Sequence, residues 1–137
     1  MRNSTIKYLE EELCNYDHTR KRMKELREEI RTPWQPQDEN IGGGRSNNNV
    51  STTELTATRL VNDKRIEHLE RVTIAIEKVF DEGNQLEQQL MDLYYFKKPR
   101  LLTVDGIVDR LHISRSHFFR IKKGIIIKLA DELGIEH

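Results

Sequence analysis

Residues 111–124 read LHISRSHFFRIKKG, and this stretch decides how the C-terminal part of the chain folds. It interleaves basic and apolar residues without the alternation of a β-strand, and the spacing of its apolar residues fits a helix. Ser114 is a residue type that caps helices, so we expect a helix to begin directly after it. Four apolar residues share the inward face of this helix, namely Phe118, Ile121, Ile125 and Leu129. The stretch therefore predicts an amphipathic helix with a basic outer side.

A shorter helix is expected directly before this basic helix. Thr103 can cap it, and the turn into the basic helix falls at residues 112–113. Gly106 lies in its middle, where we expect the two helices to come close. Its apolar face consists of Val104, Ile107, Val108 and Leu111. A short helix, a turn of about three residues and a longer basic helix together predict a helix-turn-helix.

The basic helix has the order of residues that a DNA-reading helix needs. Such a helix enters the major groove with its N-terminal turns foremost, so the residues just after the cap meet base edges. Arginine matches two acceptors of guanine, whereas lysines further along the helix suit phosphates. The backbone amides at the start of the helix also favour a phosphate. The candidate DNA-binding residues are Ser114, Arg115, Ser116, His117, Phe119, Arg120, Lys122 and Lys123.

Each of these residues also has a purely structural interpretation. Ser114 is a helix cap first, and Phe119 fits the core as well as it fits a groove wall. His117, Arg115 and Arg120 could all be solvated surface residues. The clustering of basic residues favours DNA, because a surface that only keeps a helix soluble normally mixes both charge signs.

The net charge of the whole chain hides a local excess of basic residues. Lysines and arginines number 23, aspartates and glutamates also number 23, and the formal net charge is zero. Between residues 97 and 128, however, nine basic residues are opposed only by Asp105 and Asp109, which leaves a net charge of +7. Dissolved salt screens the electrostatic field of charged residues beyond roughly 10 Å. This local basic patch therefore attracts a polyanion even though the whole chain is neutral.

The N-terminal region is expected to be helical as well. Residues 4–31 predict one helix with a narrow apolar stripe, which only the position near Arg20 interrupts. A narrow stripe needs a partner helix from the same chain or from a second copy, and we favour the same chain. The stripe consists of Ile6, Leu9, Leu13, Tyr16, Met23, Leu26 and Ile30.

Residues 32–51 read TPWQPQDENIGGGRSNNNVS, which predicts a loop. Pro33 ends the preceding helix, because the residue before a proline is pushed out of the helical region. Trp34 is expected to pin this loop onto the core, with a binding role as the alternative.

Two further helices are expected between this loop and the helix that Thr103 caps. One spans residues 52–82 and stops at Gly83. The next begins after Asn84, with Glu87 three residues on in a capping-box pattern, and ends at KKPR. Its buried face consists of Leu86, Leu90, Leu93 and Tyr94.

The sequence thus predicts an all-α protein, because no segment alternates convincingly. Long N-terminal helices are followed by a C-terminal helix-turn-helix. We expect four regions: an N-terminal helix at 1–32, a linker at 33–53, a central long helix at 54–83 and a DNA-binding domain at 84–137.

Other kinds of chemistry have little support in the sequence. Cys14 is the single cysteine, so an intramolecular disulfide is impossible. Cys14 and His18 are four residues apart on a helix, but two ligands do not make a metal site. The glycines at 42–44 lack the GK[ST] ending of a phosphate loop, and no nucleophile, base and orienting acid fall together. We expect no enzyme, no metal, no cofactor and no membrane span, and a cytoplasmic location.

Two parts of the sequence resemble known families. The segment from Gln85 to Leu133, which includes LTVDGIVDRLHISRSHFFRIKKG, looks like the helix-turn-helix of sigma-factor region 4 and its relatives. The order LEEELCNY, LREEIRTPWQPQDENIGGG and TELTATRL is similar to the RinA family of phage transcriptional regulators, within the broader ArpU/RinA group. The second resemblance covers nearly the whole chain.

The resemblance implies a phage protein that activates late genes, those for packaging and morphogenesis, in a bacterial host cell. It implies binding to double-stranded DNA in a promoter region and help to host RNA polymerase. It also implies reading residues on the basic helix, at Arg115, Ser116, His117 and Arg120. The operator sequence does not follow, because the outer face of such helices varies with the operator.

Two other functions stay open. A DNA-packaging component such as a small terminase subunit also joins a helix-turn-helix to helical oligomerisation segments, and a large ring would distinguish it from a monomeric or dimeric regulator. A helical interaction protein would pair its basic face with an acidic partner and bind DNA only weakly. For the regulator we expect a homodimer on DNA, because two half-sites roughly double the base contacts.

Overall fold

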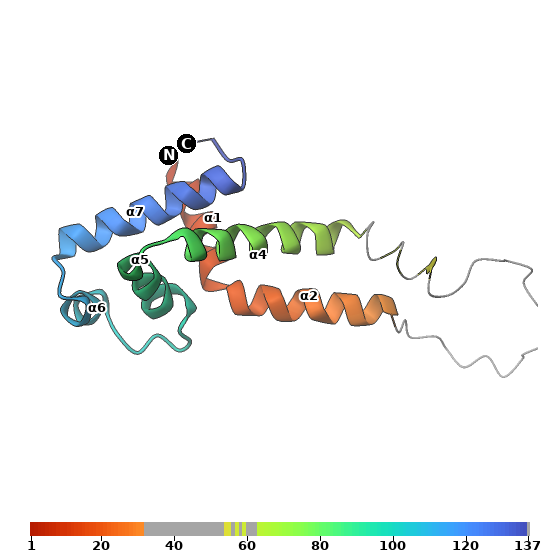
Figure 1. Cartoon of the computed structure of the whole chain (residues 1–137), viewed down its shortest axis with the longest axis horizontal. Helices are drawn as coiled ribbons and strands as arrows, with labels where there is room; N and C mark the ends of the chain where they lie inside the picture. Colours follow the sequence, from red (N-terminus) through yellow and green to blue (C-terminus); the bar gives the residue numbers. More distant parts are fainter. Residues whose placement is uncertain (32–53, 56, 58, 60–62, 137) are drawn as a thin grey trace, which may run out of the picture.

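The computed structural model describes residues 1–31, 54, 55, 57, 59 and 63–136. The predicted loop at 32–51, with Trp34, lies outside these residues. The described residues form helices and no strand, which confirms the all-α prediction. None of these helices is long and apolar enough to cross a membrane. The elements are α1 (Asn3–Cys14), α2 (Tyr16–Arg31), α4 (Lys64–Glu82), α5 (Gln85–Leu90), the π-helix η1 (Met91–Phe96), α6 (Val104–Leu111) and α7 (Arg115–Glu132) (Figure 1).

The N-terminal helix predicted over residues 4–31 is divided at Asn15. Asn15 has φ −94° and ψ 9°, so α1 ends before it and α2 begins after it. The two helices pack in different places. Leu9 and Leu13 of α1 are fully buried in the main core, whereas α2 runs alongside α4 (Figure 1). The prediction of one continuous helix was wrong because the apolar stripe of a single helix could not reach both surfaces.

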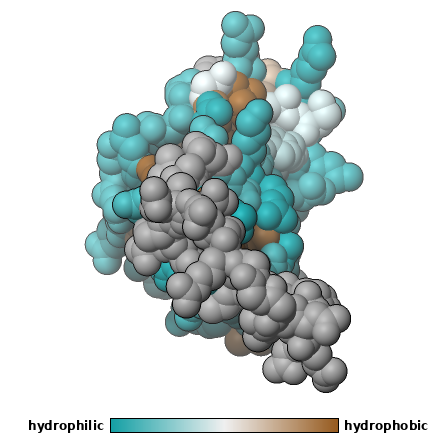
Figure 2. Space-filling model, turned by 90° about the vertical axis from the view of Figure 1, so that its right-hand side faces the viewer, coloured by the Kyte–Doolittle hydropathy of each residue, from teal (hydrophilic) through white to brown (hydrophobic). Residues whose placement is uncertain are grey.

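The apolar side of α2 is covered by α4 of the same chain, as expected for the N-terminal stripe. Leu26 of α2 is 1% exposed, and Ile66 of α4 is 3% exposed. Nη2 of Arg27 also lies 3.8 Å from Oε2 of Glu70, which forms an ion pair between the two helices. The pair of helices extends away from the others as an arm (Figure 1). Seen from the end of this arm, the described surface is mostly hydrophilic with small, separate apolar spots (Figure 2).

Helix α4 begins later than predicted, at Lys64. Asp63 is extended, with φ −75° and ψ 110°, and its side chain accepts hydrogen bonds from the backbone N–H groups of Arg65 and Ile66. This cap starts a new helix and interrupts the long one that the apolar spacing indicated. The predicted stop is confirmed, because Gly83 is the residue at which α4 ends.

The third predicted helix begins and ends as expected. The side chain of Asn84 accepts the backbone N–H of Glu87 at 2.8 Å, which confirms the predicted cap. Helical structure ends at Phe96, directly before the KKPR stretch.

The buried face of this helix differs from the prediction because its second half is a π-helix. The backbone N–H of Lys97 donates to the carbonyl oxygen of Asp92 at 2.9 Å, five residues back. The wider turn holds an additional residue, so the inward face shifts along the chain. Leu90, Met91 and Tyr95 are fully buried, whereas Leu86, Leu93 and Tyr94 are only partly buried.

The main core lies where α7 packs against α1, α4, α5 and α6. Phe118, Ile125 and Leu129 of α7 are 0% exposed, and Ile121 is partly buried, which confirms the predicted inward face. Burying each such side chain contributes roughly 1.5–3 kcal/mol. Ile126 is buried as well, so the second half of α7 is enclosed over a wider arc than the first. The N-terminal half of α7 is therefore the more exposed half.

Candidate nucleic-acid interface

The candidate interface is built on α6, a short turn and the N-terminal half of α7. Thr103 Oγ1 accepts the backbone N–H of Gly106 at 3.2 Å, which confirms the predicted cap of α6. Ser114 Oγ accepts the backbone N–H of His117 at 3.0 Å, which confirms the predicted cap of α7. Between the two helices, His112 takes the left-handed conformation, with φ 56° and ψ 44°. This conformation ends α6 and turns the chain into α7.

Gly106 does not mark a close crossing of α6 and α7. The nearest neighbours of a Cβ atom added there would be Leu102 Cδ2 at 3.3 Å and Thr103 Oγ1 at 3.6 Å. Both residues belong to the chain that leads into α6. The prediction was wrong because Gly106 lies in the first turn of α6 and faces back towards that segment. Helix α6 contributes Ile107 and Val108, rather than Gly106, to the core that it shares with α7.

Three residues of α7 form an exposed line that we call the basic strip: Ser116, Arg120 and Lys123. They are four and three residues apart, so they share one side of the helix, opposite the buried Phe118. Helix α7 contains no acidic residue before Asp131. Within the described part of the chain, neither Arg120 nor Lys123 forms an ion pair. The strip therefore presents its positive charge to solvent.

Arg115 lies beside the basic strip and is held in place by α6. Its Nη1 lies 2.7 Å from Oδ1 of Asp105. Its guanidinium carbon lies 5.4 Å from the centroid of the Phe119 ring. The side chains of Arg115 and Asp105 are 60% and 77% exposed, so water screens the ion pair and it contributes little to stability. The contact joins the start of α7 to α6.

The other residues near the start of α7 combine surface and packing contacts. Phe119 is 42% exposed, and its ring meets the Phe118 ring edge-on at 5.2 Å, so it lies at the border of the core. His117 is partly buried, and its backbone N–H is used by the cap. Ser114 is exposed, but its hydroxyl oxygen already accepts that N–H.

Lys122 is tied to α1 and does not belong to the basic strip. Its Nζ lies 2.7 Å from Oε1 of Glu10, and its side chain is 19% exposed. The same oxygen accepts the hydroxyl of buried Tyr95 at 3.2 Å. Burial, reinforced by Glu10, raises the pKa of Tyr95 well above its usual value, so this hydroxyl remains a donor. The ammonium also lies near the rings of Tyr94 and Phe119, at 5.5 and 5.6 Å from their centroids.

Two more basic residues of the positively charged segment contact other helices. Nζ of Lys128 lies 2.7 Å from Oε2 of Glu87 in α5. The guanidinium of Arg100 lies over the ring of Tyr94, 4.1 Å from its centroid. Part of the local positive charge therefore holds helices together. Sequence reasoning could not identify the Lys128–Glu87 pair, because the two residues are 41 positions apart along the chain.

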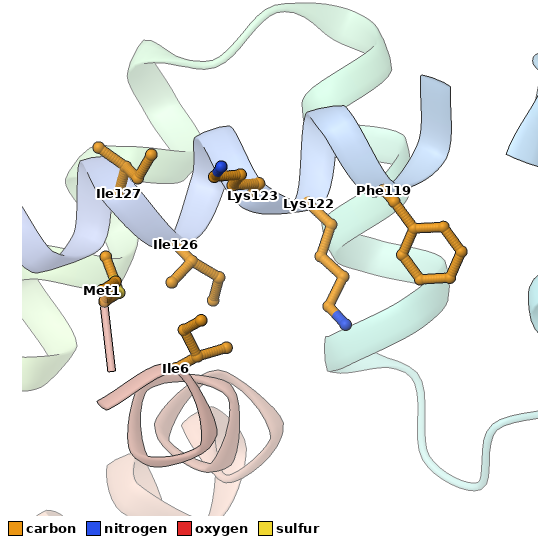
Figure 3. A pocket seen from close by; sticks show the side chains of 7 residues that line it. All are labelled: Met1, Ile6, Phe119, Lys122, Lys123, Ile126 and Ile127. Carbon is orange, nitrogen blue, oxygen red and sulfur yellow. The ribbon is translucent and has the colours of Figure 1, made fainter. Parts of the chain in front are cut away.

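A hollow of about 280 Å³ lies between α1 and α7, next to the basic strip (Figure 3). Ile6 and Ile126 face each other across it, and Lys123 and Phe119 also line it.

Among the described residues, no three histidine, cysteine or acidic side chains come together in a way that could hold a metal.

Known proteins similar to this chain cover almost its whole length. A model of the family described as "Protein of unknown function (DUF722)" matches residues 3–131. The Transcriptional activator rinA of Staphylococcus phage phi11 is 40% identical over 131 residues, which is 96% of this chain and 91% of that protein. The chain is a RinA-type member of the DUF722 family. The resemblance to the RinA family seen in the sequence is thus confirmed.

For this RinA-type chain, the family match runs from the start of α1 almost to the end of α7. The basic strip, Arg115 and the Lys122–Glu10 pair all lie within it. No solved structure matches the chain. The likeness of its C-terminal helices to sigma-factor region 4 stays a prediction.

Proposed function

We propose that this chain is a phage transcriptional activator that binds double-stranded DNA through α7. The basic strip is the observation that carries the proposal. Ser116, Arg120 and Lys123 are exposed on a capped helix that follows a short helix and a turn. In helix-turn-helix proteins, the second helix brings its N-terminal turns to the base edges in the same way.

The side chains suit different parts of the DNA. Arg115 and Arg120 are proposed to read guanines, because a guanidinium donates to two acceptors of that base. Ser116 and His117 are close enough to the cap to reach base edges as well. Lys123 is proposed to contact a phosphate, as do the backbone amides that follow Ser114.

Phe119 and Lys122 are proposed to support this surface. The guanidinium of Arg115 lies over the ring of Phe119, and we propose that this ring forms part of the surface that faces the DNA groove. Lys122 is bound to Glu10, so its positive charge is partly neutralised before DNA arrives. We therefore expect Lys122 to contribute less to phosphate binding than Lys123.

The comparison with known proteins supports the regulatory part of the proposal. The phi11 protein that is 40% identical carries the name of a transcriptional activator. We propose that the target genes are late genes for packaging and morphogenesis, read by host RNA polymerase, as the family resemblance implies. The DNA-binding part is assigned to residues 84–137, and a pair of chains is proposed to occupy two half-sites.

The test is binding of the full chain to fragments of the phage genome that encodes it, at near-physiological salt. We expect the wild-type chain to retain one or a few fragments upstream of packaging genes. The Arg115→Ala/Arg120→Ala double variant should lose them. Uniform weak retention of every fragment, unchanged in the variant, would overturn the proposal.

A further inference from the structure

We infer that Asp105 is a positioning residue that raises the selectivity with which Arg115 reads DNA, an inference that rests on the function proposed above. The two side chains come from different helices, α6 and α7, and meet at 2.7 Å. The contact is exposed, so its main effect is not on folding. Asp105 instead determines which direction the Arg115 guanidinium takes before DNA is bound.

The geometry leaves the guanidinium able to bind a base. An arginine side chain has five N–H donors, and the contact with Asp105 engages Nη1 only. The guanidinium also lies over the ring of Phe119, with 5.4 Å between the ring centroid and the guanidinium carbon. An arginine held in this way loses less side-chain entropy when it binds than a freely rotating one.

The carboxylate of Asp105 also repels DNA, but this effect does not depend on sequence. It is 77% exposed and lies 2.7 Å from the Arg115 guanidinium, so it repels the phosphates of any DNA sequence that approaches Arg115. This repulsion weakens binding to every sequence by a similar factor, whereas a correctly directed Arg115 gains two directed hydrogen bonds only at a site with a matching guanine. The positioning of Arg115, and not the repulsion, therefore increases the ratio of specific to unspecific affinity.

Asp109 provides a matched control on the same helix. It is exposed, lies one turn after Asp105 and has a side chain that forms no ion pair with a described residue. Asp109→Asn removes the same charge from nearly the same place without touching Arg115. Any effect of charge alone should therefore appear equally in Asp105→Asn and in Asp109→Asn.

The experiment begins with selection of tight binders from a pool of random double-stranded DNA by the wild-type chain. Affinities are then measured for a selected duplex and for a duplex of scrambled sequence, with thermal unfolding to confirm that each variant folds. Asp109→Asn should bind both duplexes more tightly by the same factor. Asp105→Asn should bind the scrambled duplex more tightly, but its selected-to-scrambled ratio should fall roughly two- to fivefold, as expected for the loss of an exposed ion pair.

Two further readouts test the link to Arg115. Sequences selected by Asp105→Asn should lose their preference at one base pair, the same one that Arg115→Ala loses. The Asp105→Asn/Arg115→Ala double variant should have a selected-to-scrambled ratio no lower than that of Arg115→Ala alone. Equal ratios for Asp105→Asn and Asp109→Asn would overturn the inference. Failure of the wild-type chain to prefer any sequence is a different result, because it would overturn the proposed function before a variant is compared.

Discussion

Nζ of Lys122 lies 2.7 Å from Oε1 of Glu10, and this ion pair joins the proposed DNA-reading helix to the first helix of the chain. The two side chains are 19% and 26% exposed, so water screens them less than it screens the Arg115–Asp105 pair. Glu10 also accepts the hydroxyl of Tyr95, which brings η1 into the same contact. The position of α7 therefore depends on α1, at the opposite end of the sequence.

Glu10→Gln is expected to lower the free energy of unfolding by about 1–2 kcal/mol, because Lys122 and Tyr95 lose a charged acceptor. Unfolding in urea measures this change. Glu11→Gln is the matched control, since Glu11 is the exposed next residue and forms no ion pair with a described residue. Equal stability of the two variants would show that the Glu10 contact contributes nothing.

Ser114→Ala is expected to destabilise the chain by about 1 kcal/mol, because the backbone N–H of His117 loses its acceptor. Ser116→Ala in the same turn should have a much smaller effect, since Ser116 is exposed and does not cap the helix. Chemical denaturation of both variants tests the difference. A larger loss for Ser116→Ala would contradict the assignment of the cap.

Gly124→Ala is expected to stabilise the chain by about 0.5–1 kcal/mol. Gly124 lies inside α7, where alanine is the better helix former, and an added Cβ would have nothing within 4 Å beyond the helix itself. The midpoint of urea unfolding should rise without a change in the slope of the transition. Destabilisation would mean that this side of α7 is covered in solution, for example by a second copy.

Stability is expected to fall as the pH rises from 10 towards 12, in part through Tyr16. Burial, together with its hydrogen bond to Glu77 at 2.6 Å, raises the pKa of Tyr16 to about 12 from an ordinary value of 10.0. In this range the unfolded chain releases the Tyr16 proton while the folded chain retains it, so ionisation favours unfolding. Tyr16→Phe keeps the ring beside Phe96 but cannot ionise.

Urea unfolding across this pH range should show a shallower loss of stability for Tyr16→Phe than for the wild-type chain. Tyr95 also has a raised pKa, so the variant should retain part of the pH dependence. Identical pH profiles for both chains would contradict a raised pKa at Tyr16.

Binding to DNA is expected to weaken strongly with salt. Neutralising roughly five phosphates per chain gives a slope of about −4 to −5 for log K against log salt concentration. Lys123→Ala should reduce the magnitude of this slope by about 1. Lys128→Ala should leave it nearly unchanged, because Lys128 is paired with Glu87. A larger change in slope for Lys128→Ala than for Lys123→Ala would place the DNA on another side of α7.

Local features of the fold were predictable from the sequence. The caps at Asn84, Thr103 and Ser114 and the stop at Gly83 were each identified correctly. A cap is a hydrogen bond between residues two or three positions apart, so the residue types nearby are sufficient to indicate it. The inward face of α7 was predictable for a similar reason, since apolar spacing reports which side of one helix is buried.

The predictions that proved wrong concern features that depend on neighbouring helices far away in the sequence. The division at Asn15 separates α1, which packs on α7, from α2, which packs on α4. The π-helix shifts the buried face of η1 to Met91 and Tyr95. Gly106 proved to face Leu102 and not α7. Periodicity describes one helix at a time, so it does not report where the neighbouring helix lies.

The candidate interface shows the same distinction. The sequence by itself determined that α7 is a capped helix with Ser116, Arg120 and Lys123 on the side opposite its apolar face, because these are consequences of spacing within one helix. Only the tertiary structure decided which other positive charges are available. It directed Lys122 to Glu10 and Arg115 to Asp105, because an ion pair depends on distance in space and those acidic partners lie on other helices.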